Sequence, residues 1–415
     1  MSIRLARLAL MLLAVMVMGV FLPIGQKMLS GESMGKTQLF YSPVIKKFIY
    51  REKVGEGHSF VTLDEDGTSY DRTTFETMIP FIYYRNMELW GKLPLVLDGQ
   101  TFTKEQIRTN RQVFELKARN ITGNFPRIQV FPLLESVPGR SRLRFPEDAF
   151  RMTDQMEFIN VDTNKVDPVL TQIYTKALTD AGFVFPARLV AGKVSILKPF
   201  DEGFFLVDAR NTVFHIKRVK GKPFVVRTPI PADLGIRHIK VSENKKKAIY
   251  GLILTHTGEL YLMTYDNYGL IRLPVEGYKP DTMDIKLIIN PLFVTAIFSD
   301  DTIIHAVAMN KAYEPIARYQ HVMFSGKKRV ADKIVDALFP FVIQTHDANT
   351  GYLPFRFQWS GWTSLLGTAL ALAVGCVLAY RRKGGFRTHW PDLVLIVVTG
   401  FYGLLAVTMI GPETD

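Results

Sequence analysis

Hydrophobic residues gather in three long runs, whereas the rest of the chain alternates between short apolar and polar stretches. The runs occupy residues 8–24, 361–380 and 393–410. A helix needs about 20 apolar residues to cross a hydrocarbon core of about 30 Å. We therefore expect three transmembrane helices around one large central region.

Basic residues beside the runs predict their orientation. Arg4 and Arg7 precede the first run, and Arg381, Arg382, Lys383 and Arg387 follow the second. Lys and Arg next to a span favour the cytoplasmic side. The expected order is an N-terminal transmembrane anchor (1–24), an extracytoplasmic domain (25–360), a second span (361–380), a basic cytoplasmic loop (381–390), a third span (391–410) and an extracytoplasmic tail (411–415).

The first run also has the basic start and the apolar length of a signal peptide. No small-x-small cleavage pattern follows it. An uncleaved anchor is therefore favoured, and a cleaved signal peptide is the alternative.

Between the first and second runs, β-rich segments alternate with tight polar turns. The clearest turns lie at 208–211, 255–259, 266–267 and 299–301, with weaker examples at 64–67 and 154–155. Successive repeats lie roughly 40 to 50 residues apart, as propeller blades do. We predict a mainly β extracytoplasmic domain that forms a degenerate β-propeller of about five blades or a related sandwich array. A single irregular antiparallel domain is the alternative.

Capping signals predict helical inserts in this domain. One helix begins at the capping box of Thr103 and Gln106 and extends to Lys117. Another follows Asp167 and ends before Gly182, with Leu170, Ile173, Tyr174 and Leu178 on one face. A short third helix spans 330–338 and stops before Pro340.

Composition limits the chemistry of the chain. The single cysteine, Cys376, lies in the second run, so the outer domain has no disulfide. The formal charge of +12 comes partly from the basic flanks of the runs. Two basic clusters, at 245–247 and 327–329, are interpreted either as contacts to anionic lipid headgroups or as solvated loops.

No catalytic or metal-ligating signature stands out. His215, His238, His256 and His305 lie in or beside predicted strands, but no two have the i,i+4 spacing of a zinc site and no carboxylate recurs beside them. We predict no catalytic residues, no metal, no cofactor and no nucleic-acid partner. An extracytoplasmic hydrolase with an unrecognised site is an alternative.

The second run carries a stripe of small residues that predicts close helix packing. Gly367, Ala371, Gly375 and Ala379 recur every four positions, and Thr363 precedes them. Small residues let two helix backbones approach closely in lipid. The partner helix is either this chain's third span, through Gly400 and Gly403, or a helix of another membrane protein.

Two further stretches carry a resemblance to a known family. They are 92–100 (KLPLVLDGQ) and 181–186 (AGFVFP), the latter leading to 198–204 (KPFDEGF). With the layout of the spans, they resemble a family of uncharacterised Bacteroidetes membrane proteins that have one N-terminal span, a β-rich outer domain and two C-terminal spans. The family is encoded beside ABC transporter genes, which implies a bacterial inner-membrane location and a permease or other membrane protein as partner.

From these features we expect a non-enzymatic accessory subunit of an ABC-type transporter. Its outer domain would bind a partner or a substrate of unknown identity, and its spans would contact membrane lipid and the permease. The alternative in a different class is an extracytoplasmic ligand sensor that signals through a membrane partner.

Overall fold

The computed structural model describes residues 2–29, 37–53, 60–323, 330–381 and 385–411. The chain divides into two compact units. The β unit comprises Thr37–Glu52 and Phe60–Val322, and the helical unit comprises Met1–Lys36, Lys53–Ser59 and Met323–Asp415. Each unit is described separately below.

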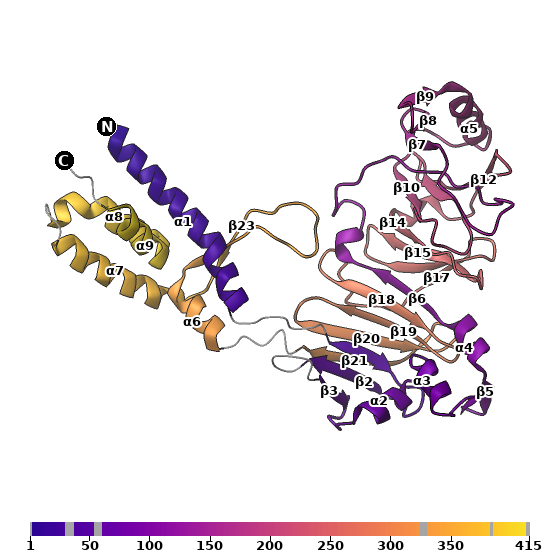
Figure 1. Cartoon of the computed structure of the whole chain (residues 1–415), viewed down its shortest axis with the longest axis horizontal. Coiled ribbons are helices and arrows are strands. Elements are labelled where there is room, and N and C mark those ends of the chain that lie inside the picture. The colour runs from indigo at the N-terminus through magenta and orange to yellow at the C-terminus, as the bar shows by residue number, and fades with distance from the viewer. Residues whose placement is uncertain (1, 30–36, 54–59, 324–329, 382–384, 412–415) are drawn as a thin grey trace. The chain divides into compact units, whose positions relative to one another are not determined.

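Three antiparallel meanders follow one another in the β unit (Figure 1). The first contains β10 (Leu189–Gly192), β11 (Phe204–Val207), β12 (Val213–Val219) and β13 (Lys222–Arg227). The second contains β14 (Ile236–Val241), β15 (Ile249–Thr255), β16 (Leu260–Thr264) and β17 (Leu270–Arg272). The third contains β18 (Asp284–Ile289), β19 (Val294–Ser299), β20 (Ile303–Met309) and β21 (Pro315–Val322), and β6 (Gln112–Leu116) pairs with β18 at its edge. The hairpins expected at 208–211, 255–259, 266–267 and 299–301 are all present.

Smaller sheets flank the meanders. They are β1 (Gln38–Tyr41), β2 (Phe48–Lys53) and β3 (Phe60–Asp64); β4 (Leu95–Leu97) and β5 (Gln100–Phe102); and β7 (Asp148–Met152), β8 (Met156–Asn160) and β9 (Lys165–Asp167). The hairpin expected at 154–155 joins β7 to β8. The weak repeat expected at 59–75 is only half correct, because Asp71 caps a helix that contains Phe75.

Alternate residues of the central strands enter different hydrophobic cores. Phe204 and Leu206 of β11 face a core shared with helix α5, whereas Phe205 and Val207 face a core shared with the second meander. Successive side chains of a strand point to opposite faces, so a sheet covered on both sides reads as a continuous apolar run. This is why β11 and β15 are buried at every position.

Short helices complete the β unit. They are α2 (Arg72–Met78), α3 (Tyr84–Leu89), α4 (Lys104–Asn110), α5 (Pro168–Asp180) and the 3₁₀ turns η1 (Ala118–Asn120) and η2 (Ala232–Leu234). Asp167 caps α5 as expected, with its carboxylate accepting from the amides of Val169 and Leu170. The expected buried face is correct for Tyr174 and Leu178, but Ile173 is exposed.

The helix expected to reach Lys117 ends earlier. The capping box of Thr103 and Gln106 is present, but α4 stops at Asn110 and the next residues form β6. Residues 112–116 alternate between buried and exposed positions, a period of two that favours a strand over a helix. Pairing with β18 satisfies their backbone groups.

The expected five-bladed propeller is wrong. The three meanders begin at Leu189, Ile236 and Asp284, in agreement with the predicted period. Within the described residues, however, the sheets close neither a ring nor a barrel. Propellers need at least about four blades, and the residues before 189 form small sheets and helices instead of further meanders.

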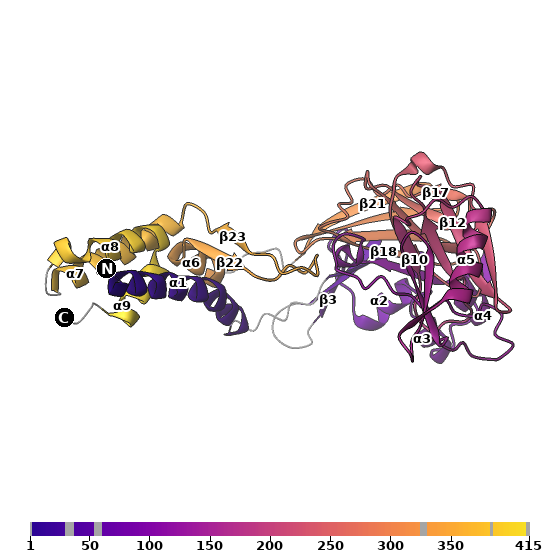
Figure 2. The ribbon, with the colours of Figure 1, turned by 90° about the horizontal axis from the view of Figure 1, so that it is seen from above.

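The helical unit contains two helices that are long and apolar enough to cross a membrane. Its elements are α1 (Ser2–Leu29), α6 (Val330–Leu338), α7 (Ser364–Arg381), α8 (Gly385–Thr399), α9 (Phe401–Ile410) and the hairpin of β22 (Phe341–Gln344) and β23 (Arg356–Trp359) (Figure 2). The two long helices are α1 and α7, and most of their apolar side chains are exposed. The short helix expected at 330–338 is α6.

The third hydrophobic run does not form one continuous span. Gly400, with φ of 58°, separates α8 from α9. Ten residues of α9 extend only about 15 Å, half the thickness of a bilayer core. Gly403 packs against the backbone of Leu395 and Ile396, so α9 folds back along α8.

Arg7, near the start of α1, contacts both Asp392 in the first half of α8 and Gly411, the residue after α9. Its guanidinium donates to both carboxylate oxygens of Asp392, at 2.8 and 2.9 Å, and its Nε donates to the Gly411 carbonyl at 2.8 Å. Asp392 thus lies within α8 and pairs with Arg7 of α1. The start of α1 and the end of α9 therefore lie at the same end of this unit, whereas the sequence placed them on opposite sides.

Some expectations fall on residues that the structure does not describe. Arg382 and Lys383, the basic cluster at 327–329 and the last four residues lie outside the described residues, as does the side chain of Arg4. Arg381 ends α7 and Arg387 lies in the first turn of α8.

We predict that the two chain termini are on the same side of the membrane. Fluorescent reporters would be fused before Met1 and after Asp415, and a Lys222→Cys variant in a Cys376→Ala background would report the β unit. Protease and thiol-labelling accessibility would be measured in spheroplasts and in inverted vesicles. Both termini should respond alike, because the hydrogen bond between Arg7 and Gly411 requires their proximity. Lys222→Cys reports the side of the β unit in the same preparations. Opposite responses of the two termini would contradict the folded-back arrangement.

Candidate functional site

A cavity of about 500 Å³ lies where edge strands of three sheets converge in the β unit. The strands are β6, β10 and β14, each the outermost strand of its own sheet. Ligand pockets are typically 300–1,000 Å³ in volume. The cavity is therefore large enough for a small organic molecule.

Apolar and polar residues both line the cavity. Phe114, Leu189, Ile239 and Val241 are buried and line it. This combination is typical of small-molecule sites, in which apolar walls supply affinity and a few polar groups supply orientation.

The polar side chains in the cavity are mainly basic. Arg127, Lys193 and Lys240 line it, and Glu115 is the one acidic residue among its described lining residues. Lys240 is half-buried, and its pKa is lowered by burial and by the nearby charges of Arg127 and Lys193. Positive potential therefore accumulates in the cavity, where Lys240 is half-buried and Arg127 and Lys193 are exposed.

His238 presents an unpartnered nitrogen in the same wall. The residue is 4% exposed, and its Nδ1 lies 3.0 Å from the Thr122 hydroxyl. Its Nε2 is buried and has no hydrogen-bond partner in the described part of the chain. Burial, with the charges of Arg127, Lys240 and Arg237, lowers the pKa of His238 to about 3, so the imidazole is neutral at physiological pH.

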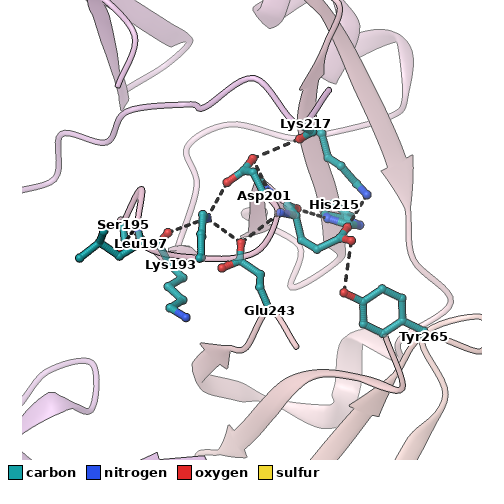
Figure 3. A network of polar contacts seen from close by, with 12 residues as sticks. Lys193, Ser195, Leu197, Asp201, His215, Lys217, Glu243 and Tyr265 are labelled. Carbon is teal, nitrogen blue, oxygen red and sulfur yellow. Dashed lines mark hydrogen bonds and ion pairs between the residues drawn. The ribbon is translucent and has the colours of Figure 1, made fainter. Parts of the chain in front are cut away.

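A buried ionic network lies next to the cavity (Figure 3). The Lys198 ammonium donates to Asp201 Oδ1 and Glu243 Oε1, both at 2.6 Å, and to the Lys193 carbonyl at 2.8 Å. All three charged side chains are at most 2% exposed. Burial raises the pKa of Glu243, and the nearby carboxylate of Asp201 raises it further.

The network extends through Glu202 to the core of the first meander. The carboxylate of Glu202 pairs with Lys217 and accepts from Tyr265 at 3.2 Å, and its backbone carbonyl accepts from His215 Nε2 at 2.5 Å. His215 Nδ1 lies 3.0 Å from the Tyr268 hydroxyl. A neutral imidazole with its proton on Nε2 satisfies both contacts, and burial lowers the pKa of His215 to about 3.

Gly203 allows the chain to pass through this crowded region. Its φ is +69°, and a Cβ there would lie 2.0 Å from the carbonyl oxygen of Ile216. Only glycine fits such a position. Its amide donates to Asp201 Oδ2 at 3.0 Å, so the turn and the ionic network support each other.

The network and the cavity share parts of the backbone. Lys193 lines the cavity and supplies the carbonyl that Lys198 binds, and Ser242 lines it directly before Glu243. The network thus joins the β10–β11 connection to the end of β14 and fixes two walls of the cavity.

Sequence analysis identified the KPFDEGF segment (198–204) only as part of a resemblance and gave it no role. It also considered His215 and His238 only as metal ligands, and the structure places them in the network and the cavity wall, respectively. One sequence signal was overlooked. His238 and Lys240 are two residues apart on a strand and therefore share a face.

The small-residue stripe packs against helices of this chain. A Cβ on Gly375 would lie 2.6 Å from Ile396 Cδ1 of α8, and one on Gly367 would lie 2.3 Å from the Ala337 carbonyl oxygen of α6. Ala371 and Ala379 are buried, whereas Thr363, which precedes α7, is exposed. Gly400 and Gly403 lie at the bend between α8 and α9.

A family model matches residues 38–309 of the chain, which include the whole network and cavity. The chain belongs to the family described as domain of unknown function DUF4857. A comparison with curated proteins finds no match. The DUF4857 region therefore carries the candidate site.

Comparison with solved structures finds only distant similarity. An auxiliary nutrient binding protein from Bacteroides thetaiotaomicron is 8% identical over 70% of this chain and 58% of its own length, with a TM-score of 0.24. A Bacteroides fragilis protein described as exported is 7% identical over 57% of this chain and 82% of its own, with a TM-score of 0.16. This chain thus spans less than two thirds of the first protein, and TM-scores this low do not show a shared fold.

We predict that Lys198→Met destabilises the β unit by roughly 3–5 kcal/mol, because it leaves Asp201 and Glu243 buried without their shared cation. The measurement is the urea midpoint of the full-length protein in detergent. Lys222→Met, at an exposed position of β13, is the matched control and should change the midpoint little. Equal midpoints for the two variants would show that the network does not stabilise the fold.

We also predict that acid destabilises the β unit through His215. Its folded pKa of about 3 lies below the ordinary value of 6.5, so the unfolded chain binds the proton more readily. The stabilisation is complete above pH 6.5 and is lost as the pH falls toward 3, by an amount on the order of 4 kcal/mol.

Urea unfolding of the full-length protein at several pH values measures this loss. His215→Gln should weaken the pH dependence, whereas His256→Gln, at an exposed turn, should leave it unchanged. An unaltered slope in His215→Gln would refute the assignment.

Proposed function

We propose that this protein is a non-enzymatic, membrane-anchored accessory subunit of an ABC-type transporter. Its β unit binds a small molecule outside the cytoplasm, and its helical unit sits in the bacterial inner membrane beside a permease. The observation that carries the proposal is the cavity of about 500 Å³ between β6, β10 and β14. A binding subunit requires such a preformed space.

The exposed apolar surface of the helical unit supports the membrane location. Leu5, Leu10 and Leu13 of α1 and Leu366 and Leu370 of α7 are each more than half exposed. Soluble proteins rarely leave such contiguous apolar surface uncovered. Lipid and a neighbouring membrane protein would cover it.

The small-residue stripe of α7 packs within this chain, which limits the surface on which a permease can dock. Gly367 and Gly375 are occupied by α6 and α8 of this chain, so their face of α7 is not available to a permease. The exposed leucines on the other face of α7 are the surface that remains. We therefore assign permease docking to the exposed face that includes Leu366 and Leu370.

Co-purification tests the accessory role. The tagged full-length protein would be isolated from native membranes in mild detergent, and its partners would be identified by mass spectrometry. We expect an ABC permease and its ATPase to be enriched at least fivefold over a tagged, unrelated inner-membrane protein expressed at the same level. Leu370→Trp should reduce this enrichment, while Leu12→Trp on α1 is the matched control for an exposed leucine.

Other outcomes would contradict the proposal. Recovery of the chain alone as a monomer would do so. Enrichment of a signalling protein in place of the transporter would favour a ligand sensor.

A further inference from the structure

The main cavity contains positive charge that the chain does not neutralise. Arg127, Lys193 and Lys240 line it, and within the described part of the chain none of the three forms an ion pair. The acidic lining residue, Glu115, has its Oε1 3.7 Å from Lys117 Nζ. Like charges that line one cavity repel one another, and a bound anion would relieve this repulsion.

A neighbouring cavity shows the opposite arrangement. It has a volume of about 380 Å³ and shares Leu189 with the main cavity. Its arginines are already engaged: Arg188 donates to Asn211 Oδ1 at 2.5 Å, and Arg237 donates to Asp281 Oδ2 at 3.1 Å. One of these two arginines, Arg237, is thus paired with a carboxylate, whereas none of the three cations of the main cavity is, within the described residues.

His238 supplies a directional donor beside these charges. When its Nδ1 accepts from the Thr122 hydroxyl, the ring proton lies on Nε2, the buried nitrogen without a partner. A buried polar group without a hydrogen-bond partner destabilises the folded state. A ligand oxygen that accepts from Nε2 would give this atom the partner that it lacks among the described residues.

We propose that the main cavity binds an organic anion. Its carboxylate or phosphate group accepts a hydrogen bond from His238 Nε2 and pairs with Lys240 and Arg127. Its apolar body lies against Phe114 and Leu189. The inference rests on the proposed function in that it names the ligand class of the same outer unit.

Isothermal titration calorimetry of the detergent-solubilised full-length protein tests this inference. The probes are benzoate and phenyl phosphate as anions and benzamide as the uncharged counterpart. We expect at least one anion to bind and benzamide to bind at least fivefold more weakly. Comparison of the two anions distinguishes a carboxylate site from a phosphate site.

Three variants and a control locate the binding. Lys240→Met, Arg127→Gln and His238→Phe should each weaken anion binding at least fivefold, whereas Lys222→Met on exposed β13 should not. Arg127 is exposed, so its variant tests the site even where a buried substitution prevents folding. Equal binding of benzoate and benzamide, or unchanged anion binding in folded Arg127→Gln and Lys240→Met, would overturn the inference.

The outcome is distinguishable from that of the accessory role. Loss of transporter co-purification with anion binding retained would refute only the accessory role. Absence of anion binding with co-purification retained would refute only the ligand assignment.

Discussion

The ion pairs that Lys198 makes with Asp201 and Glu243 are the interaction on which the β unit depends. Three charged side chains have been removed from water together, and desolvation opposes such burial. It is tolerable because the ammonium also reaches the Lys193 carbonyl and because Glu243 Oε1 accepts from the Glu202 amide. The contacts join segments 45 residues apart, from two different meanders. They therefore define how one meander meets the next.

This constraint explains why a cavity persists between the edge strands. Edge strands tend to pair with any available neighbour. Here β10 and β14 belong to separate sheets whose connections are fixed by Lys198, and β6 belongs to the third meander. Polar and apolar side chains line the space between them, and no further strand fills it. His238 and Lys240, two residues apart on β14, therefore both line a space that lies between separate sheets.

The sequence predicted local features well and long-range ones poorly. The hairpin turns and the caps at Thr103 and Asp167 depend on a few adjacent residues, so they were identified correctly. The end of α4 was missed because pairing of β6 with β18, more than 160 residues away, decides it. The predicted propeller was wrong because ring closure depends on how many meanders the chain contains. The weak repeats before residue 189 were counted as blades, but they form smaller sheets. The cavity could not be predicted from the sequence, because its cations come from three separate segments of the chain.

The helical unit follows the same rule, that a buried charge fixes the arrangement of its neighbours. Hydropathy alone reads residues 393–410 as one span, because it counts apolar side chains and ignores backbone conformation. Gly400 has a positive φ that a continuous helix does not allow, so the run folds back and brings Asp392 and Gly411 to one place. A carboxylate in an apolar bundle needs a partner, and Arg7 provides a bidentate one, assisted by His389 at 3.4 Å. Sequence analysis considered Arg7 only as a signal for the orientation of the first span. In the structure, Arg7 also connects α1 to α8 and to the end of α9.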